Sequence, residues 1–217
     1  MFMLDNVPIF KNRTEAGRRL ALKLLSYKPK HPLILALPRG GVPVDYEIAR
    51  ALKAPLDTIV VRKIGAPFNP EFAVGAIAPN GVVIIDSETV QSLGISKKDI
   101  NYIIEKEKLE MERRILLYHS GEYSRDVLAE TIIIVDDGLA TGLTARVAIQ
   151  SVILTHKPKE IVFAVPIGSK DIVRALRDTV SVVCLEEVDN LMAIGYWYKE
   201  FNQVTDEEVI EYLEKAN

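Results

Sequence analysis

Apolar and polar positions alternate along the chain with the periods of helices and strands. Residues 14–27 carry apolar side chains at helical spacing until Pro29 ends the pattern. Short apolar runs at 33–37 and 132–135 are typical of strands that are covered on both faces. The same patterns predict further helices at 42–52, 96–119, 141–155, 169–177 and from Thr205, and further strands at 56–61, 160–165 and 180–185. This alternation predicts an α/β fold, a mostly parallel twisted sheet with helices on both faces.

The segment 62–81 interrupts this alternation because it is rich in proline and glycine. It predicts a mobile loop with hinges at Gly65 and Gly75, which leads into a hairpin of strands 72–77 and 82–85. We therefore expect one domain over residues 1–217. Its parts are a core at about 30–185, a flexible loop and hairpin at about 62–86, and a small hood at about 186–217.

Composition and charge exclude several classes of function. The 217 residues are 48% hydrophobic and 26% charged, with a formal net charge of -3, so no broad basic surface for nucleic acid is expected. No apolar run reaches the roughly 18 residues of a membrane span, and no secretory signal is visible, so the cytoplasm is the expected location. Cys184 lies in an apolar run and is expected to be a buried strand thiol. With three scattered histidines, a zinc site is not expected.

The strongest chemical signal lies at residues 136–144, between the strand at 132–135 and a helix. Two carboxylates, Asp136 and Asp137, end the strand, and small residues follow that let a ligand approach the backbone. The helix start offers unpaired N–H groups to a phosphate. Carboxylates would repel a phosphate beside them, so the acids suit sugar hydroxyls or Mg²⁺ while the loop binds a phosphate farther along the same molecule. Each feature alone also fits an ordinary strand end or helix cap, but their order favours a phosphosugar site.

Residues 132–144, IIIVDDGLATGLT, resemble the 5-phosphoribosyl 1-pyrophosphate (PRPP) motif of the type I phosphoribosyltransferases. The order of elements over about 33–185 is similar as well, and the chain looks most like the uncharacterised branch of predicted phosphoribosyltransferases. The resemblance implies the cofactor Mg²⁺, held largely through PRPP and water, and commonly a homodimer. It implies that Asp136 and Asp137 contact the ribose 2′- and 3′-hydroxyls. It also implies that the 5′-phosphate is held by Gly138, Leu139, Ala140, Thr141, Gly142 and Thr144.

A second loop, Leu37-Pro38-Arg39-Gly40-Gly41, follows the first predicted strand. Its glycines free the backbone to wrap an anion, and Arg39 can clamp two phosphate oxygens. By itself the loop fits a plain strand-to-helix turn equally well. It is similar to the pyrophosphate loop of the family, a resemblance that implies pyrophosphate binding by Pro38, Arg39, Gly40 and Gly41 and a cis peptide bond between Pro38 and Arg39.

Arg62 and Lys63 follow a predicted strand and precede Gly65. A solvated pair on an exposed turn and a closing lid whose cations meet the pyrophosphate both remain open. Arg62-Lys63-x-Gly65 looks like the start of the flexible loop in adenine-type members, but their downstream acidic-tyrosine motif is not recognisable.

The resemblance implies transfer of the phosphoribosyl group from PRPP to a small planar acceptor, with Asp136, Asp137, Arg39 and Lys63 as catalytic residues. Ala140 stands where members acting on 6-oxopurines carry an aspartate, so the chain is more similar to adenine, orotate and uracil members.

The acceptor site itself is expected near the C-terminal part of the chain. Tyr196 or Trp197 could stack on the acceptor base, although an apolar lid fits them equally well. The nearby Glu186, Glu187 and Asp189 fit solvated acids better than readers of an amino group. Two other functions remain open: a non-catalytic sensor of PRPP or a nucleotide, and a hydrolase that consumes PRPP without a base.

Overall fold

The computed structural model describes residues 8–118, 129–189 and 191–216. Its residues form two compact units. Among the described residues, the first comprises 8–58, 129–141, 158–189 and 191–216, and the second comprises 59–118 and 142–157. The expected division into one domain with a core and a hood stays a prediction.

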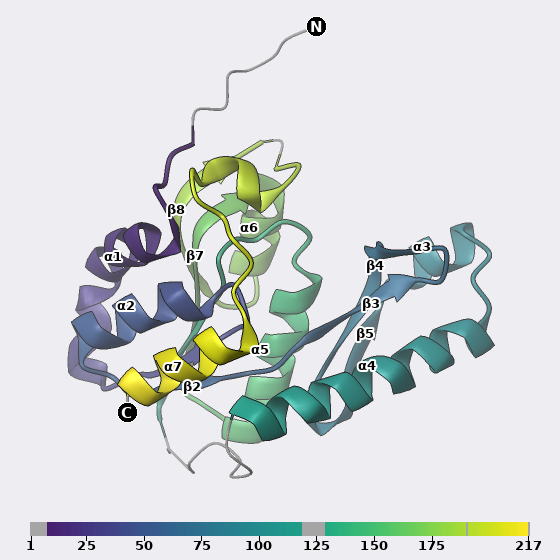
Figure 1. The fold of residues 1–217 in the computed structure, drawn as a ribbon, viewed down its shortest axis with the longest axis horizontal. Coiled ribbons are helices and arrows are strands. Elements are labelled where there is room, and N and C mark those ends of the chain that lie inside the picture. Colours follow the sequence, from purple (N-terminus) through teal and green to yellow (C-terminus); the bar gives the residue numbers. More distant parts are fainter. Residues whose placement is uncertain (1–7, 119–128, 190, 217) are drawn as a thin grey trace, which may run out of the picture. The chain divides into compact units, whose positions relative to one another are not determined.

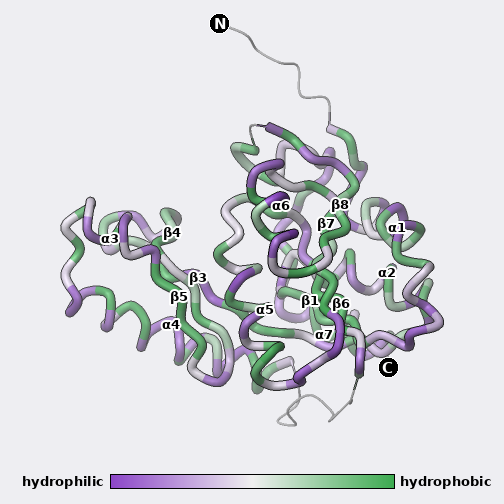
Figure 2. Tube along the Cα trace, turned by 180° about the vertical axis from the view of Figure 1, so that it is seen from behind, coloured by the Kyte–Doolittle hydropathy of each residue, from purple (hydrophilic) through white to green (hydrophobic). Residues whose placement is uncertain are grey.

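The first unit contains a parallel sheet of five strands in the order β2-β1-β6-β7-β8 (Figure 1). Strands β1 and β6 are buried at every position, as their continuous apolar sequences predict (Figure 2). The strands are β1 (Leu33–Ala36), β2 (Leu56–Thr58), β6 (Thr131–Val135), β7 (Glu160–Ser169) and β8 (Ser181–Val188).

Helices cover both faces of this sheet. Helix α2 (Val42–Leu52) connects β1 to β2, and α6 (Lys170–Arg177) connects β7 to β8. Because β2 and β8 form opposite edges of the sheet, right-handed crossovers place these helices on opposite faces (Figure 1). The unit also contains α1 (Arg13–Leu24), which packs on α2, and η1 (Leu25–Lys30), η3 (Ile194–Trp197) and α7 (Asp206–Ala216). The predicted fold class is therefore confirmed.

The second unit is built on an antiparallel sheet in the order β3-β4-β5. The predicted hairpin at Pro79-Asn80-Gly81 is present, and both Asn80 and Gly81 have positive φ angles, 63° and 74°. Its apolar face packs on α5 through a cluster that contains Ala76, Val82 and Val147. The elements are β3 (Arg62–Ala66), β4 (Asn69–Ala78), η2 (Pro79–Gly81), β5 (Val82–Ile85), α3 (Ser87–Ser92), α4 (Lys97–Tyr118) and α5 (Leu143–His156).

The prediction of a mobile loop after residue 61 is wrong. Residues Arg62–Ala66 form strand β3 and pair with β4, and the register shifts around Gly65. A Cβ on Gly65 would lie 2.2 Å from the carbonyl oxygen of Pro70, so this glycine permits close strand approach and is not the predicted hinge. Gly75 likewise lies inside β4, opposite Ile64 and Ile85.

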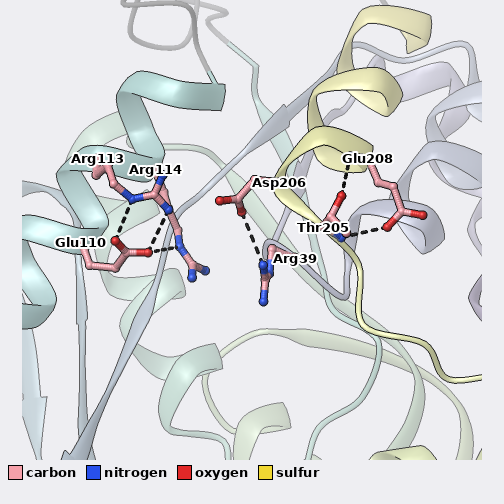
Figure 3. A network of polar contacts seen from close by, with 7 residues as sticks. All are labelled: Arg39, Glu110, Arg113, Arg114, Thr205, Asp206 and Glu208. Carbon is pink, nitrogen blue, oxygen red and sulfur yellow. Dashed lines mark hydrogen bonds and ion pairs between the residues drawn. The ribbon is translucent and has the colours of Figure 1, made fainter.

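Helix α4 confirms the predicted long helix, although its predicted last residue, His119, lies outside the described residues. A capping box opens the helix: the Asp99 amide donates to Ser96 Oγ at 3.1 Å. Farther along, Glu110 accepts hydrogen bonds from Nε of Arg113 at 2.8 Å and of Arg114 at 2.7 Å (Figure 3). These bonds lower the pKa of Glu110 to about 2. Among the helices of the described ranges, none is both long and apolar enough to cross a membrane.

Candidate functional site

Strands β1 and β6 are neighbours, so the two loops identified in the sequence leave the same edge of the sheet side by side. The last pair in register is Ala36 with Val135, and the Leu37 amide donates to the Val135 carbonyl at 2.9 Å. The chain order reverses between these strands, because β1 continues to β2 on one side while β6 continues to β7 on the other. Ligands of parallel α/β sheets bind beyond the carboxyl ends of the strands at such a point.

The loop after β6 is fixed to the first unit as far as Thr141. The Leu139 amide donates to the Ile167 carbonyl at 2.9 Å, and the Leu139 carbonyl accepts from the Ser169 amide at 2.9 Å. The amide of Leu139 is therefore used inside the fold, which departs from its predicted role toward a phosphate. A Cβ on Gly138 would lie 2.8 Å from the side chain of Ile194, so any larger residue there would require Ile194 to move. Beyond Thr141, Gly142 has a φ of 75° and precedes the first residue of α5, and Thr144 lies in the first turn of that helix.

Asp137 is nearly buried, with 8% of its surface exposed, and three other segments hold it. Nε and Nη2 of Arg13 each lie 2.8 Å from its Oδ2 atom. The hydroxyl of Tyr198 donates to its carbonyl oxygen at 2.7 Å. Burial, together with the nearby Asp137 carboxylate, raises the pKa of the Tyr198 phenol, so it acts as a donor at neutral pH. The same carboxylate oxygen also faces Gly40, where a Cβ would lie 2.1 Å from Oδ2.

Arg39 lies in the loop after β1, next to the start of α7. The Pro38–Arg39 peptide bond is cis, as the resemblance implies. Nη1 of Arg39 lies 3.7 Å from Oδ1 of Asp206, the first residue of α7, and this ion pair is three-quarters buried at Arg39 (Figure 3). Thr205 and Glu208 form a capping box at this helix start, with bonds of 2.8 and 3.2 Å (Figure 3). The loop after β1 therefore carries a largely buried cation that already holds one anionic group.

Asp45 on α2 was not singled out from the sequence. Its side chain is completely buried, and neither carboxylate oxygen has a hydrogen-bond partner among the described residues. Burial raises the pKa of Asp45 well above its ordinary value, and the negative charge of Asp136 raises it further. The Asp136 carboxylate in turn accepts a bond from the Asp137 amide at 2.8 Å.

A family model described as "Phosphoribosyl transferase domain" matches residues 4–200. The chain belongs to this family. The predicted recognition is thereby confirmed, and the chain is a phosphoribosyltransferase domain.

The names of similar curated proteins are consistent with this family assignment. Two curated proteins of Mycobacterium tuberculosis, strains H37Rv and CDC 1551, each named "putative phosphoribosyl transferase", are 40% identical over 210 residues. Those residues make up 96% of this chain but 47% of each relative, so the chain spans about half the length of the curated relatives it matches.

Two solved structures share the fold at different levels of sequence identity. Protein TT1426 of Thermus thermophilus is 33% identical, with a TM-score of 0.76, and the match covers 95% of this chain and 98% of that one. A hypothetical protein from Neisseria gonorrhoeae, solved with bound ppGpp, is 12% identical with a TM-score of 0.50 over 97% of both chains. At that identity the likeness concerns the fold alone.

Arg62 and Lys63 of this phosphoribosyltransferase domain belong to the second unit, in β3. Nε and Nη2 of Arg62 bind Oε2 of Glu107 on α4, at 2.8 and 2.7 Å, while Lys63 is exposed. The expectation that both residues stand on a flexible loop is wrong, because they are the first residues of a paired strand.

The aromatic residues proposed for the acceptor differ in environment. Tyr196 is 64% exposed, whereas Trp197 packs against a cluster that contains Phe10, Ile167 and Tyr198. The Trp197 carbonyl accepts from the amides of Ile9 and Phe10 at 3.0 Å. Trp197 thus helps to close an apolar cluster, and Tyr196 is the side chain with a free surface.

The three acids near the C-terminal end of β8 are each paired with a cation. Glu186 lies 3.2 Å from Arg19, Glu187 lies 2.6 Å from Arg177, and Asp189 lies 2.8 Å from Lys170. These contacts favour the interpretation of ordinary surface acids over recognition of an acceptor amino group.

The carboxylates at this edge of the sheet suit a Mg²⁺ ion that is also bound by a substrate. No group of three or more His, Cys, Asp or Glu residues gathers around a metal-sized site in the ranges that the structure describes. Two adjacent carboxylates, Asp136 and Asp137, are nonetheless present at the loop. Mg²⁺ commonly binds through one or two carboxylates and completes its shell with water and substrate phosphates. The residues therefore fit the predicted cofactor.

Proposed function

We propose that this chain transfers the 5-phosphoribosyl group of PRPP to a ring nitrogen of a nucleobase-like acceptor and releases pyrophosphate. The observation that carries the proposal is the contact between the two loops, where the Asp137 carboxylate lies against Gly40 at the carboxyl ends of β1 and β6. One ligand bound at that edge can meet two carboxylates, Arg39 and a glycine-rich loop together.

Different residues would bind different parts of the PRPP molecule. Asp136 and Asp137 would bind the ribose hydroxyls, and the loop from Gly138 to Thr144 would hold the 5′-phosphate through amides other than that of Leu139. Arg39 would bind the pyrophosphate in place of Asp206, since its guanidinium already attracts an anionic group. The roles of Arg62 and Lys63 toward the pyrophosphate rest on the resemblance and are retained as part of this proposal.

In the proposed reaction the lone pair of the acceptor nitrogen forms a bond to C1 of the ribose. The bond between C1 and the pyrophosphate oxygen breaks, and pyrophosphate leaves with that electron pair. Arg39 stabilises the charge that develops on the leaving group. Asp136 and Asp137 hold the ribose in the reactive orientation and offset positive charge on the ring. Ala140 cannot accept a proton, so a proton on the acceptor nitrogen passes to water or to another base.

Magnesium fits this scheme as a resident cofactor. Asp136 and Asp137 would hold it, largely through PRPP oxygens and water. When bound, it would neutralise charge on the pyrophosphate leaving group. The cytoplasmic location, the homodimer and the planar acceptor remain predictions.

The test is pyrophosphate release from PRPP and Mg²⁺ with a panel of bases. Release that depends on adenine, orotate, uracil or another base supports the transferase. Release without any base would replace it with the hydrolase, and binding of PRPP without release would replace it with the sensor. Asp137→Asn is expected to lose most of the turnover. Asp178→Asn, an exposed aspartate at the end of α6, is the matched control and is expected to keep it.

A further inference from the structure

Arg13 makes contacts that no part of the proposed reaction yet explains. It is the first residue of α1, directly after Asn12, whose side chain caps the helix by accepting from the Glu15 amide at 3.0 Å. This cap fixes where the helix begins and so fixes the backbone of Arg13. The Arg13 side chain points away from solvent, with 11% of its surface exposed.

The guanidinium of Arg13 is used on three sides. Nε and Nη2 lie 2.8 Å from Oδ2 of Asp137, and Nη1 donates to the Asn202 carbonyl at 2.7 Å. Its Cζ atom lies over the Phe201 ring, 3.7 Å from the ring centre. A planar fork held in this way has little freedom left, which distinguishes it from a mobile surface ion pair.

Both contacts that Arg13 makes with Asp137 are with one carboxylate oxygen. Oδ2 receives them and also faces Gly40, whereas Oδ1 has no hydrogen bond within the part of the chain that the structure describes. The two oxygens therefore differ: one is anchored to the protein and the other is available to a ligand. The Tyr198 hydroxyl fixes the backbone carbonyl of the same residue, so Asp137 is held at both ends.

The positive charge of Arg13 also reduces the electrostatic repulsion between the carboxylates of the site and an anionic ligand. Asp136 and Asp137 are adjacent, and the proposed donor is itself a polyanion. A buried cation on Asp137 reduces the repulsion that these carboxylates exert on a phosphorylated sugar.

We propose that Arg13 is a positioning residue for PRPP. It anchors Oδ2 of Asp137 so that Oδ1 meets a ribose hydroxyl, and Phe201 and the Asn202 carbonyl keep the guanidinium in place. The C-terminal segment from Tyr198 to Asn202 is therefore a supporting part of the donor site. This inference deepens the proposed function and rests on it.

The test is calorimetric titration of the full chain with PRPP and Mg²⁺. Arg13→Gln is expected to weaken PRPP binding by about ten- to a hundredfold, the scale of a small misplacement of a binding group. Arg177→Gln, which removes the exposed pair with Glu187, is the matched control and is expected to bind PRPP as the wild type does. Unchanged affinity in folded Arg13→Gln would overturn the inference.

A double-mutant cycle separates positioning from a purely structural role. If Arg13 acts through Asp137, Arg13→Gln adds less than about a twofold further loss in the Asp137→Asn background. Losses that multiply would overturn the inference. If Arg13→Gln does not fold, Phe201→Leu can be used, because it removes the ring on which the Arg13 guanidinium stacks. This variant is expected to weaken PRPP binding several-fold in the wild-type chain but not in the Asp137→Asn chain. Unchanged affinity in the wild-type chain would contradict the proposal. A wild-type chain that does not bind PRPP would instead refute the proposed function, before any variant is compared.

Discussion

Replacing the buried Asp45 by asparagine should change how the stability of the protein depends on pH. The carboxyl is completely buried without a hydrogen-bond partner among the described residues, so its charged form is disfavoured and its pKa lies well above the ordinary 3.8. Below pH of about 3.9 the group is protonated in both the folded and the unfolded chain and adds no pH dependence. Above that value the unfolded chain loses the proton while the folded chain keeps it, so folding becomes less favourable as the pH rises.

The size of this effect follows from the coupling of protons to folding. Between the unfolded and the folded pKa, each pH unit costs about 1.4 kcal/mol of unfolding free energy. Asparagine has nearly the same shape and does not titrate, so Asp45→Asn removes this slope, whatever constant offset its amide introduces.

The assay is urea unfolding at several pH values from 4 to 7, followed for the wild type, Asp45→Asn and the exposed control Asp178→Asn. The difference in unfolding free energy between Asp45→Asn and wild type should grow with pH in favour of the variant. Asp178→Asn should follow the wild type in parallel. A difference between Asp45→Asn and wild type that does not change with pH would refute this reasoning.

Three further predictions test the contacts around the site. Gly40→Ala would place a Cβ 2.1 Å from Oδ2 of Asp137, so the folded variant should bind PRPP about tenfold or more weakly by calorimetry; wild-type affinity would show that the contact is dispensable. Asp206→Asn frees Arg39 from its ion pair and should bind pyrophosphate up to about fivefold more tightly in the same assay, and weaker or equal binding would speak against competition. Burial raises the pKa of Cys184 to about 12, so at pH 8 only about one thiol in ten thousand is ionised. Iodoacetamide should therefore label Cys184 far more slowly in the native chain than in the urea-unfolded chain. Similar labelling rates in the two states would contradict this prediction.

The sequence predicted the parallel sheet well because its strands carry strong local signals. Residues 132–134 are three isoleucines with no exposed surface, and a strand buried on both faces must be apolar throughout. The two loops were found for a similar reason. Glycines and paired carboxylates directly after a strand are local in sequence, and the neighbouring positions of β1 and β6 then bring the loops together.

Strand β3 was missed because its sequence carries the signals of a loop. Gly65, Pro67 and Pro70 normally interrupt strands. Here the register shifts around Gly65, and its missing side chain lets the two strands approach closely, so the same residues serve a bulged antiparallel pair.

The supports of Asp137 could not be predicted because they are distant in sequence. Arg13 is 124 residues away and Tyr198 is 61 residues away. Single arginines at the start of a helix are common, and only the folded chain shows which carboxylate such an arginine contacts. Asp45 was overlooked for the opposite reason: an aspartate in a helix normally faces solvent, and here the packing of α2 overrides that tendency.

The most direct measurement is calorimetric titration of the wild-type chain with PRPP in the presence of Mg²⁺. The account predicts saturable binding with one PRPP per chain, strongly weakened by Asp137→Asn and unaffected by Asp178→Asn. If saturating PRPP and Mg²⁺ produced no heat and no association by a second method, the carboxylates and the loop after β6 would not form a donor site, and the account would be contradicted.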